Sequence, residues 1–419
     1  MIAGRADAEP SDVRIFDRID AVLLTACAIL TAAYALLLLS LWHGWQPINN
    51  VYFGGDPRRI WVNLNNLESS FHRTAMHPLF TSLCALTVNL SQWTGWRGET
   101  LLAFGCGVYG LLVGGLTYAV ARLWGAARGW AVGAVALLWA SGSFVSWSSI
   151  AESHSYGGLS CLIVLLGAAL LAPAGPRRLL GSAVLFVIAT SMVITNTMLW
   201  PFATCIIAAK DRTNLAGLIQ IARRNFFPLL LSLGAGLLLL YGLWLVQKAY
   251  LSHNPTLGDF LSFERDSKYF YKFGMRDKFH GLYAFGLVAP SEIKLERIIG
   301  MSISVVMLGL TALGLRKASV QLRLMLIFLG VVLVFHSLYA RSEAFIPSAN
   351  YVPVVAILVM IALSNLARST WSRAMVAAGV VLLGAYNLAA HVRVVQDLPL
   401  SSRFAVNDPA NIIPEPRDP

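Results

Sequence analysis

The sequence predicts an all-α, polytopic integral membrane protein. Apolar residues make up 57% of the 419 residues and charged residues only 13%, whereas a water-soluble domain carries about 25% charged residues. The apolar residues are concentrated in runs, and a helix of about 20 such residues spans the ~30 Å hydrocarbon layer of a bilayer. The composition therefore excludes an ordinary soluble protein.

The charged residues also narrow the class of protein. The net charge of +11 comes from 32 Lys and Arg residues scattered between the apolar runs, against 21 Asp and Glu residues. No basic stripe is present, so we predict no nucleic-acid partner. No GxxxxGK[ST] motif occurs, which indicates that the chain does not itself take up energy from ATP. The five cysteines lie inside apolar runs, a placement typical of small core residues.

The apolar runs predict about eleven transmembrane helices. The first 18 residues lack the short apolar core and the cleavage site of a signal peptide, so the first run is expected to be retained as a span. The expected spans are residues 21–42, 100–121, 129–149, 156–171, 179–194, 198–209, 226–247, 298–315, 324–340, 351–367 and 374–390.

The distribution of basic residues predicts the orientation. With the amino terminus inside, the inside segments hold 16 Lys and Arg residues in about 59 positions, and the outside segments hold 16 in about 153. Basic residues concentrate on the cytoplasmic side, so the long loops 43–99 and 248–297 are expected outside. This orientation requires the short, polar-interrupted stretch 77–93 to be an interfacial or half-inserted helix.

These boundaries predict a single transmembrane domain over residues 1–391. The polar segment 392–419 follows, and its end is rich in proline and charged residues, which favours partial disorder.

The first outer loop is the strongest candidate for a functional site. Gly54-Gly55 precede Asp56-Pro57, which predicts a tight turn that presents a carboxylate at the membrane surface. Apolar residues recur at helical spacing over 60–71 and predict an amphipathic helix on the bilayer. The alternative is an Asp-Pro turn whose neighbouring arginines meet lipid headgroups. The basic candidates for substrate binding in this loop are Arg58, Arg59, His72, Arg73 and His77.

A second candidate group lies at the outer ends of later spans. Glu152 and His154 follow the third span, and ionisable groups at the membrane rim are costly unless they face a cavity. With Asp56 they could hold a divalent cation such as Mn²⁺ or Mg²⁺, or they could hydrogen-bond to a substrate. Asn196 separates the fifth and sixth spans at the same level, either as a site residue or as a buried turn.

Two further candidate groups lie in the later outer segments. Lys268 and Tyr269 belong to a basic and aromatic stretch, 263–273, in which cations could hold a phosphate and rings could stack on a sugar or lie against lipid. The alternative is a solvated amphipathic segment. Arg341 and Glu343 follow the ninth span, where the alternative for the arginine is snorkelling to the headgroups.

The order of these features resembles the GT-C superfamily of membrane glycosyltransferases, which includes protein O-mannosyltransferases and lipid A aminoarabinose transferases. The resemblance covers the first 155 residues best. It rests on Asp56 soon after the first span, an interfacial helix, the element His77-Pro78-Leu79, two spans joined by a short basic turn, and Glu152 about 75 positions after that element. Glu343-Ala344-Phe345-Ile346 resembles a late motif of bacterial members. Several relatives have Asp at the position of Glu152, and no Asp-x-Asp occurs in this chain.

This resemblance implies an inverting hexosyl- or pentosyltransferase in the plasma (inner) membrane. Its donor would be a sugar linked to polyprenyl phosphate, and its acceptor a hydroxyl of a glycan, lipid or protein at the periplasmic or exterior face. Asp56 would be the general base, and Glu152 with His154 would orient the acceptor or hold a cation. The groups that would meet the leaving phosphate are Arg58, Arg59, Arg73, His77 and Arg341.

Two other classes are alternatives. A transporter or lipid flippase usually places charged residues at mid-membrane and has paired halves, whereas the polar candidates here gather at one face. An O-antigen polymerase or ligase would also use a polyprenyl donor, but its catalytic loop is expected late in the chain.

Overall fold

The computed structural model describes residues 17–48, 57–66, 77–171, 181–209, 223, 226–250, 285–289, 294–316, 318–338 and 348–408. These residues are mostly helical, which confirms the expected all-α class. Each of the eleven expected spans coincides with helical structure: α1 (Arg18–Ser40), α4 (Gly98–Leu123), α5 (Arg128–Ala140), α7 (Ser153–Leu171), α8 (Gly181–Met192), α9 (Leu199–Ala209), α11 (Phe226–Tyr250), α13 (Lys294–Leu315), α14 (Val320–Leu338), α15 (Ser348–Leu366) and α16 (Thr370–Asp397).

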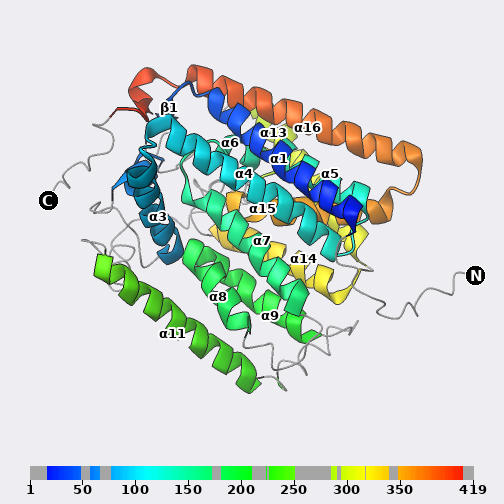
Figure 1. Ribbon diagram of the computed structural model, residues 1–419. Helices are drawn as coiled ribbons and strands as arrows, with labels where there is room; N and C mark the ends of the chain where they lie inside the picture. The colour runs from blue at the N-terminus through cyan, green and yellow to red at the C-terminus, as the bar shows by residue number, and fades with distance from the viewer. Residues whose placement is uncertain are drawn as a thin grey trace, which may run out of the picture.

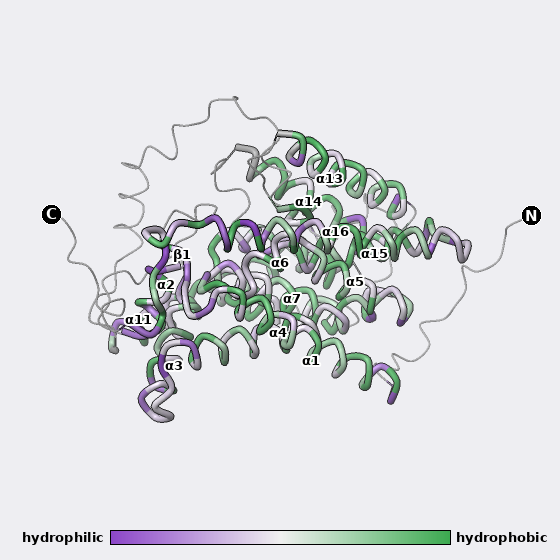
Figure 2. Tube along the Cα trace, turned by 90° about the horizontal axis from the view of Figure 1, so that it is seen from above, coloured by the Kyte–Doolittle hydropathy of each residue, from purple (hydrophilic) through white to green (hydrophobic). Residues whose placement is uncertain are grey.

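Within the described ranges, seven of these helices are long and apolar enough to cross a membrane, namely α1, α4, α7, α11, α13, α15 and α16. Shorter apolar helices lie at Arg128–Ala140, Gly181–Met192, Ile194–Ile207 and Val320–Phe335. In Figure 2 hydrophobic residues run along the long helices, and hydrophilic residues gather at the end of the bundle near β1 (Trp45–Pro47) and α2 (Pro57–Asn65). The chain is therefore a membrane-type helical bundle with one polar end in its described part.

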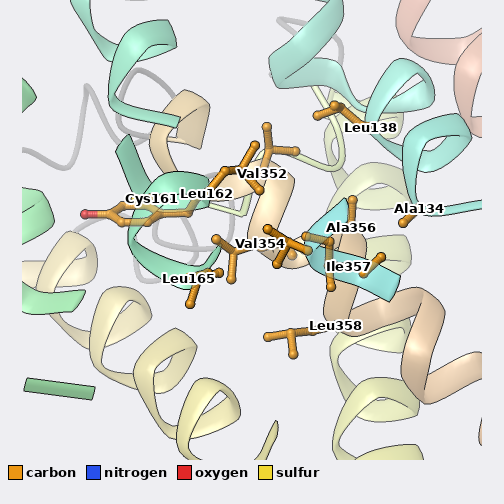
Figure 3. Packing of buried hydrophobic residues seen from close by; sticks show 14 of the residues in the cluster. Ala134, Leu138, Cys161, Leu162, Leu165, Val352, Val354, Ala356, Ile357 and Leu358 are labelled. Carbon is orange, nitrogen blue, oxygen red and sulfur yellow. The ribbon is translucent and has the colours of Figure 1, made fainter. Parts of the chain in front are cut away.

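Helix α15 forms the centre of the bundle (Figure 1). It packs against α5, α7 and α13, and 83% of its most apolar window is buried, compared with 11% for α11. Figure 3 shows side chains of α15 such as Val354 and Ile357 between residues of α7 and α5. A helix that is apolar on all sides is buried either by protein or by lipid, so α15 is enclosed by protein while α11 presents most of its surface to the surroundings.

Helices α1 and α4 pack closely along a row of small residues. A Cβ added at Gly110 or Gly114 of α4 would overlap the backbone of α1 near Ala32 or Cys27, and such small-xxx-small spacing lets two helices approach closely. Gly105, Gly107 and Gly110 have the spacing of a dinucleotide-binding motif, but they lie inside α4. That motif requires a turn between a strand and a helix, so these glycines do not form a nucleotide-binding loop.

An ion-pair cluster joins the starts of α1 and α5 to the end of α4. Asp20 is buried, and its carboxylate accepts hydrogen bonds from Arg122 Nε at 2.7 Å and from the Tyr118 hydroxyl at 2.8 Å. Arg128 forms ion pairs with both Asp20 and Asp17. Charges buried in an apolar bundle are tolerated when they are paired and hydrogen-bonded in this way.

The expected span over 129–149 is not one continuous helix, because α5 ends at Ala140 and a second short helix, α6 (Gly142–Trp147), follows. Residues 285–289 cause the break: Leu287 O and Gly286 O accept hydrogen bonds from the amides of Gly142 and Ser143. A Cβ at Gly142 would overlap the backbone of Ala289. Asn387 of α16 fixes the inserted segment through bonds to Ala140 O, Leu287 O and Ala289 N.

Helix α3 (Pro78–Thr94) covers the stretch expected to be interfacial. It lies at the end of the bundle that also carries β1, where it contacts α2, α8 and α11 (Figure 1). At 17 residues it is shorter than the helices that qualify as candidate spans. Helix α2 forms the start of the expected amphipathic helix, and residues 67–76 lie outside the described residues.

The carboxyl-terminal segment differs from the expected polar tail. Helix α16 continues to Asp397, beyond the expected boundary at 391, and is followed by η6 (Leu400–Ser402) and by strand β2 (Arg403–Ala405). Strand β2 pairs antiparallel with β1. Phe404 and Val406 are buried in an apolar cluster with residues of α2, α3 and α4. Residues 392–408 are therefore folded onto the polar end of the bundle, and 409–419 lie outside the described residues.

Candidate active site

Glu152 lies in the non-helical turn 148–152 between α6 and α7, and it is only 3% exposed. Its Oε1 accepts hydrogen bonds from Ser153 N at 2.8 Å and from Ser153 Oγ at 3.1 Å. The amino terminus of a helix carries unsatisfied N–H groups and a partial positive charge. The start of α7 therefore supplies hydrogen-bond donors to this carboxylate inside an otherwise apolar bundle.

His154 lies half-buried in the first turn of α7, beside the start of α15. Its Nδ1 is 3.2 Å from Nδ2 of Asn350, and Asn350 is fully buried. Because an amide nitrogen can only donate, Nδ1 is the acceptor and the neutral ring carries its hydrogen on Nε2. No hydrogen-bond partner of Asn350 Oδ1 is found among the described residues.

His77 approaches the same junction from the start of α3. It is 6% exposed, and its Nδ1 lies 2.9 Å from the carbonyl oxygen of Met192 at the end of α8. A ring nitrogen that faces a carbonyl oxygen carries the hydrogen, so Nδ1 of His77 donates to Met192 O. The His77 and His154 rings are edge-to-face with centroids 6.4 Å apart. The two rings thus meet where α3 and α7 begin, and α8 and α15 hold them through Met192 O and Asn350.

Asn196 packs against α7 one turn beyond His154. It lies in η3 (Ile194–Met198), fully buried, and its Nδ2 donates to Gly157 O at 2.9 Å and to Ser160 Oγ at 3.0 Å. This geometry agrees with the interpretation of Asn196 as a buried turn residue. It also fixes the helical turn whose Gly157 lies against Asn350.

Arg58 and Arg59 lie half-buried in the first turn of α2. The following residues of that helix, Ile60 and Trp61, are each 1% exposed. The apolar residues anchor α2 against α3, and this anchoring fixes the part of the chain that carries the two guanidinium groups.

An apolar cavity of about 170 Å³ lies beside the turn that carries Glu152. Its walls come from α2, α3, α4 and the segment 147–156, including Trp61, Phe80, Leu101, Tyr109, Ala151 and Ser155. The last two residues flank Glu152 in sequence. Two of the residues that line the cavity, Trp61 and Ser148, have side-chain polar atoms that are buried and have no hydrogen-bond partner among the described residues. Because most of the lining residues are apolar, the cavity is suited to an apolar ligand.

The remaining predicted site residues lie outside the described residues: Asp56, His72, Arg73, Lys268, Tyr269, Arg341 and Glu343. Within the described ranges, no group of three or more His, Cys, Asp or Glu side chains could hold a metal ion. The expected cation site formed by Asp56, Glu152 and His154 therefore stays a prediction.

The structure adds site residues that the sequence did not single out. Asn350 holds His154, and Gln46 bonds to the backbone on either side of Ile150 in the turn before Glu152. A buried amide in the first turn of an apolar helix is itself a signal of function in a membrane protein, and this signal could have identified Asn350. Neither a family model, nor a curated protein, nor a solved structure matches this chain.

Proposed function

We propose that this protein is an inverting glycosyltransferase that moves a sugar from a polyprenyl-phosphate donor to an acceptor hydroxyl at the outer face of the membrane. The observation that carries the proposal is an apolar cavity lined by Ala151 and Ser155, which lie on either side in sequence of the buried Glu152 and of His154, whose ring meets that of His77. A lipid-linked donor requires this combination of an apolar cavity for the chain and polar groups at the reacting end.

The cavity is suited to the part of the lipid chain nearest the phosphate. An apolar cavity of about 150 Å³ accepts a benzene molecule, so the volume of about 170 Å³ accommodates one isoprene-sized unit. Helix α2 contributes Trp61 and Leu64 to the wall and carries Arg58 and Arg59 one turn earlier, where cations would meet the phosphate.

In the proposed reaction the acceptor oxygen bonds to the anomeric carbon as the bond from that carbon to the phosphate oxygen breaks. The acceptor proton passes to a carboxylate, for which Asp56 is the candidate. The electron pair of the broken bond stays on the polyprenyl phosphate, where cationic side chains stabilise the growing charge. Glu152, with His154 and His77 beside it, orients the acceptor hydroxyl or holds a divalent cation of the Mn²⁺ or Mg²⁺ type.

The direct test uses purified protein in lipid nanodiscs with a panel of radiolabelled hexosyl and pentosyl decaprenyl phosphates. We expect one donor to lose its sugar to an acceptor in an added membrane or glycan extract, with release of decaprenyl phosphate. If every donor stays intact in nanodiscs but crosses the bilayer of sealed vesicles, the protein is a flippase and the proposal is wrong.

The proposal also requires the site to face outward. Single cysteines placed at Ser267 and at the exposed Ser401, in a background without the five native cysteines, are expected to react with an impermeant maleimide in intact cells. A cysteine at Thr213 should react only after permeabilisation, because it lies in a basic segment assigned to the inside. Labelling at Thr213 in intact cells together with protection at Ser401 would show that the protein has the opposite orientation in the membrane.

Filling the cavity should weaken donor binding. A Cβ at Gly105 would make only an ordinary contact, 3.5 Å from the Tyr156 hydroxyl, so Gly105→Phe would extend into the cavity with little backbone strain. We expect decaprenyl phosphate to bind about tenfold more weakly or worse, as measured by native mass spectrometry. Gly309→Phe is the matched control, since a Cβ there meets nothing within 4 Å. Equal binding by both variants would show that the lipid chain lies elsewhere.

A further inference from the structure

Gln46 connects the first outer segment to the turn that carries Glu152. Its side chain is fully buried. Its Nε2 donates to Ser149 O at 3.1 Å, and its Oε1 accepts from Ala151 N at 3.3 Å. Both hydrogen-bonding groups of the amide are thus used on the same turn, and the second of these bonds ends at the residue immediately before Glu152.

The turn has few backbone bonds of its own. Ser148 N donates to Phe144 O at 3.0 Å, while Ile150 N reaches Trp147 O only at 3.5 Å. Trp42 adds a bond from its indole Nε1 to Ser149 Oγ at 3.3 Å. Buried backbone groups must be satisfied, especially in an apolar bundle. The conformation of residues 149–151 therefore depends on side chains from the segment that follows α1.

That segment is held by the carboxyl-terminal strand. Gln46 pairs with Phe404 in the register between β1 and β2. Beyond the paired residues, Val406 N donates to Gly44 O at 3.1 Å and Ile48 N to Ser402 O at 2.9 Å. Phe404 is 3% exposed and packs in the cluster that contains Trp61 and Leu101 of the cavity wall.

Strand β2 is itself fastened at both ends. The Arg403 guanidinium donates from Nε to Leu398 O at 2.8 Å, at the end of α16. Asn407 Oδ1 accepts from Glu99 N at 3.0 Å, at the start of α4. A continuous series of contacts thus runs from the last described residues of the chain through β1 and Gln46 to the backbone beside Glu152.

We propose that Gln46 is a positioning residue for Glu152, and that strand β2 holds Gln46 in the orientation this role requires. The catalytic part of this inference rests on the proposed glycosyltransferase function. The structural part does not, since it concerns only the backbone of the turn. Loss of Gln46 should move Glu152 away from the acceptor while leaving most of the cavity wall intact.

The test replaces Gln46 by methionine, which has a similar volume but makes neither hydrogen bond. Hydrogen exchange of the full-length protein, read by mass spectrometry, should be about tenfold faster in peptides covering residues 148–153, because two bonds that restrain local opening are lost. Asn365→Leu is the control, since it removes an amide bond to Gly314 O near the opposite end of α15. It should leave exchange at 148–153 unchanged.

The kinetic constants kcat and KM distinguish the loss of positioning of Glu152 from a general loss of folded structure. We expect kcat for sugar transfer to fall about 10- to 100-fold in Gln46→Met, as for small displacements of a reacting group, with the KM for donor changed by less than about threefold. Phe404→Ala weakens the packing of β2 but keeps glutamine at position 46. Because β2 would then hold Gln46 less firmly, this variant should also accelerate hydrogen exchange in the peptides covering residues 148–153. It provides the test if Gln46→Met does not fold.

The outcomes distinguish this inference from the function on which it rests. Unchanged exchange at 148–153 in both variants overturns the positioning role, whatever the activity. Faster exchange with an unchanged kcat also overturns it. Faster exchange in a protein that cleaves none of the donors supports the structural link and refutes the glycosyltransferase proposal instead.

Discussion

Replacing Asp56 by asparagine is expected to lower sugar transfer by about 10²- to 10⁴-fold, the usual contribution of a general base. Asparagine keeps the shape of the side chain and can still form hydrogen bonds, but it cannot accept the proton of the acceptor hydroxyl. Asp56 directly precedes Pro57, the first residue of α2, which also carries Arg58 and Arg59. The measurement is transfer from the active decaprenyl-phosphate donor by purified protein at matched expression and thermal stability.

Binding separates this role from that of the arginines. Asp56→Asn should bind decaprenyl phosphate nearly as well as the parent, whereas Arg58→Ala should lose binding as well as turnover, because phosphate is present in both the ground state and the transition state. Asp397→Asn, at the exposed end of α16, is the control for loss of a carboxylate. Transfer at the parent rate by Asp56→Asn would mean that Asp56 is only a turn residue.

The positions of the helices could be predicted from the sequence, because the signal for a membrane helix lies in a single stretch of the chain. A run of apolar residues of sufficient length predicts a membrane helix whatever its partners are, and each of the eleven predicted runs coincides with helical structure. The break at Ser141 was not predictable in this way. Ser141, Gly142 and Ser143 interrupt the apolar run only briefly. The break is held by a distant segment, because carbonyl oxygens of residues 285–289 accept hydrogen bonds from the amides of Gly142 and Ser143.

For the candidate site, the sequence predicts some of the residues but not the contacts that surround them. Glu152, His154 and His77 could be selected because ionisable residues are rare in such a chain, and the structure brings the two histidines together. Their surroundings could not be predicted, since they depend on contacts between residues far apart in sequence, such as His77 with Met192 O and His154 with Asn350. No periodicity encodes such pairs, and similarity to known proteins offered no guide to them.

The fold of the carboxyl-terminal segment illustrates the same limit. Its polar composition favours disorder when considered alone, yet Phe404 and Val406 are buried and β2 pairs with β1. Two apolar residues in alternation are too weak a signal for a strand. The strand forms because β1 offers an unpaired backbone edge, and because α2, α3 and α4 leave an apolar surface for these side chains.

Glu152→Gln should abolish most of the activity without unfolding the protein. Glutamine has nearly the same volume, and its Oε1 can still accept the bond from Ser153 N that the carboxylate accepts at 2.8 Å. The exchange of a charged for a neutral acceptor weakens that bond by about 1 kcal/mol, which corresponds to a shift of only about 1 °C in the thermal midpoint of a chain of this length. The bundle should therefore remain folded.

Catalysis should be far more sensitive than stability to this substitution. In the proposed reaction the Glu152 carboxylate orients an acceptor hydroxyl or holds a cation through its charge, and the amide of glutamine would lack that charge. We expect kcat to fall about 10²-fold or more, with decaprenyl phosphate binding unchanged, because the cavity lining does not include Glu152. Glu99→Gln, at an exposed position in the first turn of α4, should leave both quantities unchanged. If Glu152→Gln keeps the parent kcat but melts many degrees lower, the carboxylate serves the fold of the turn, and the acceptor must be oriented by other residues.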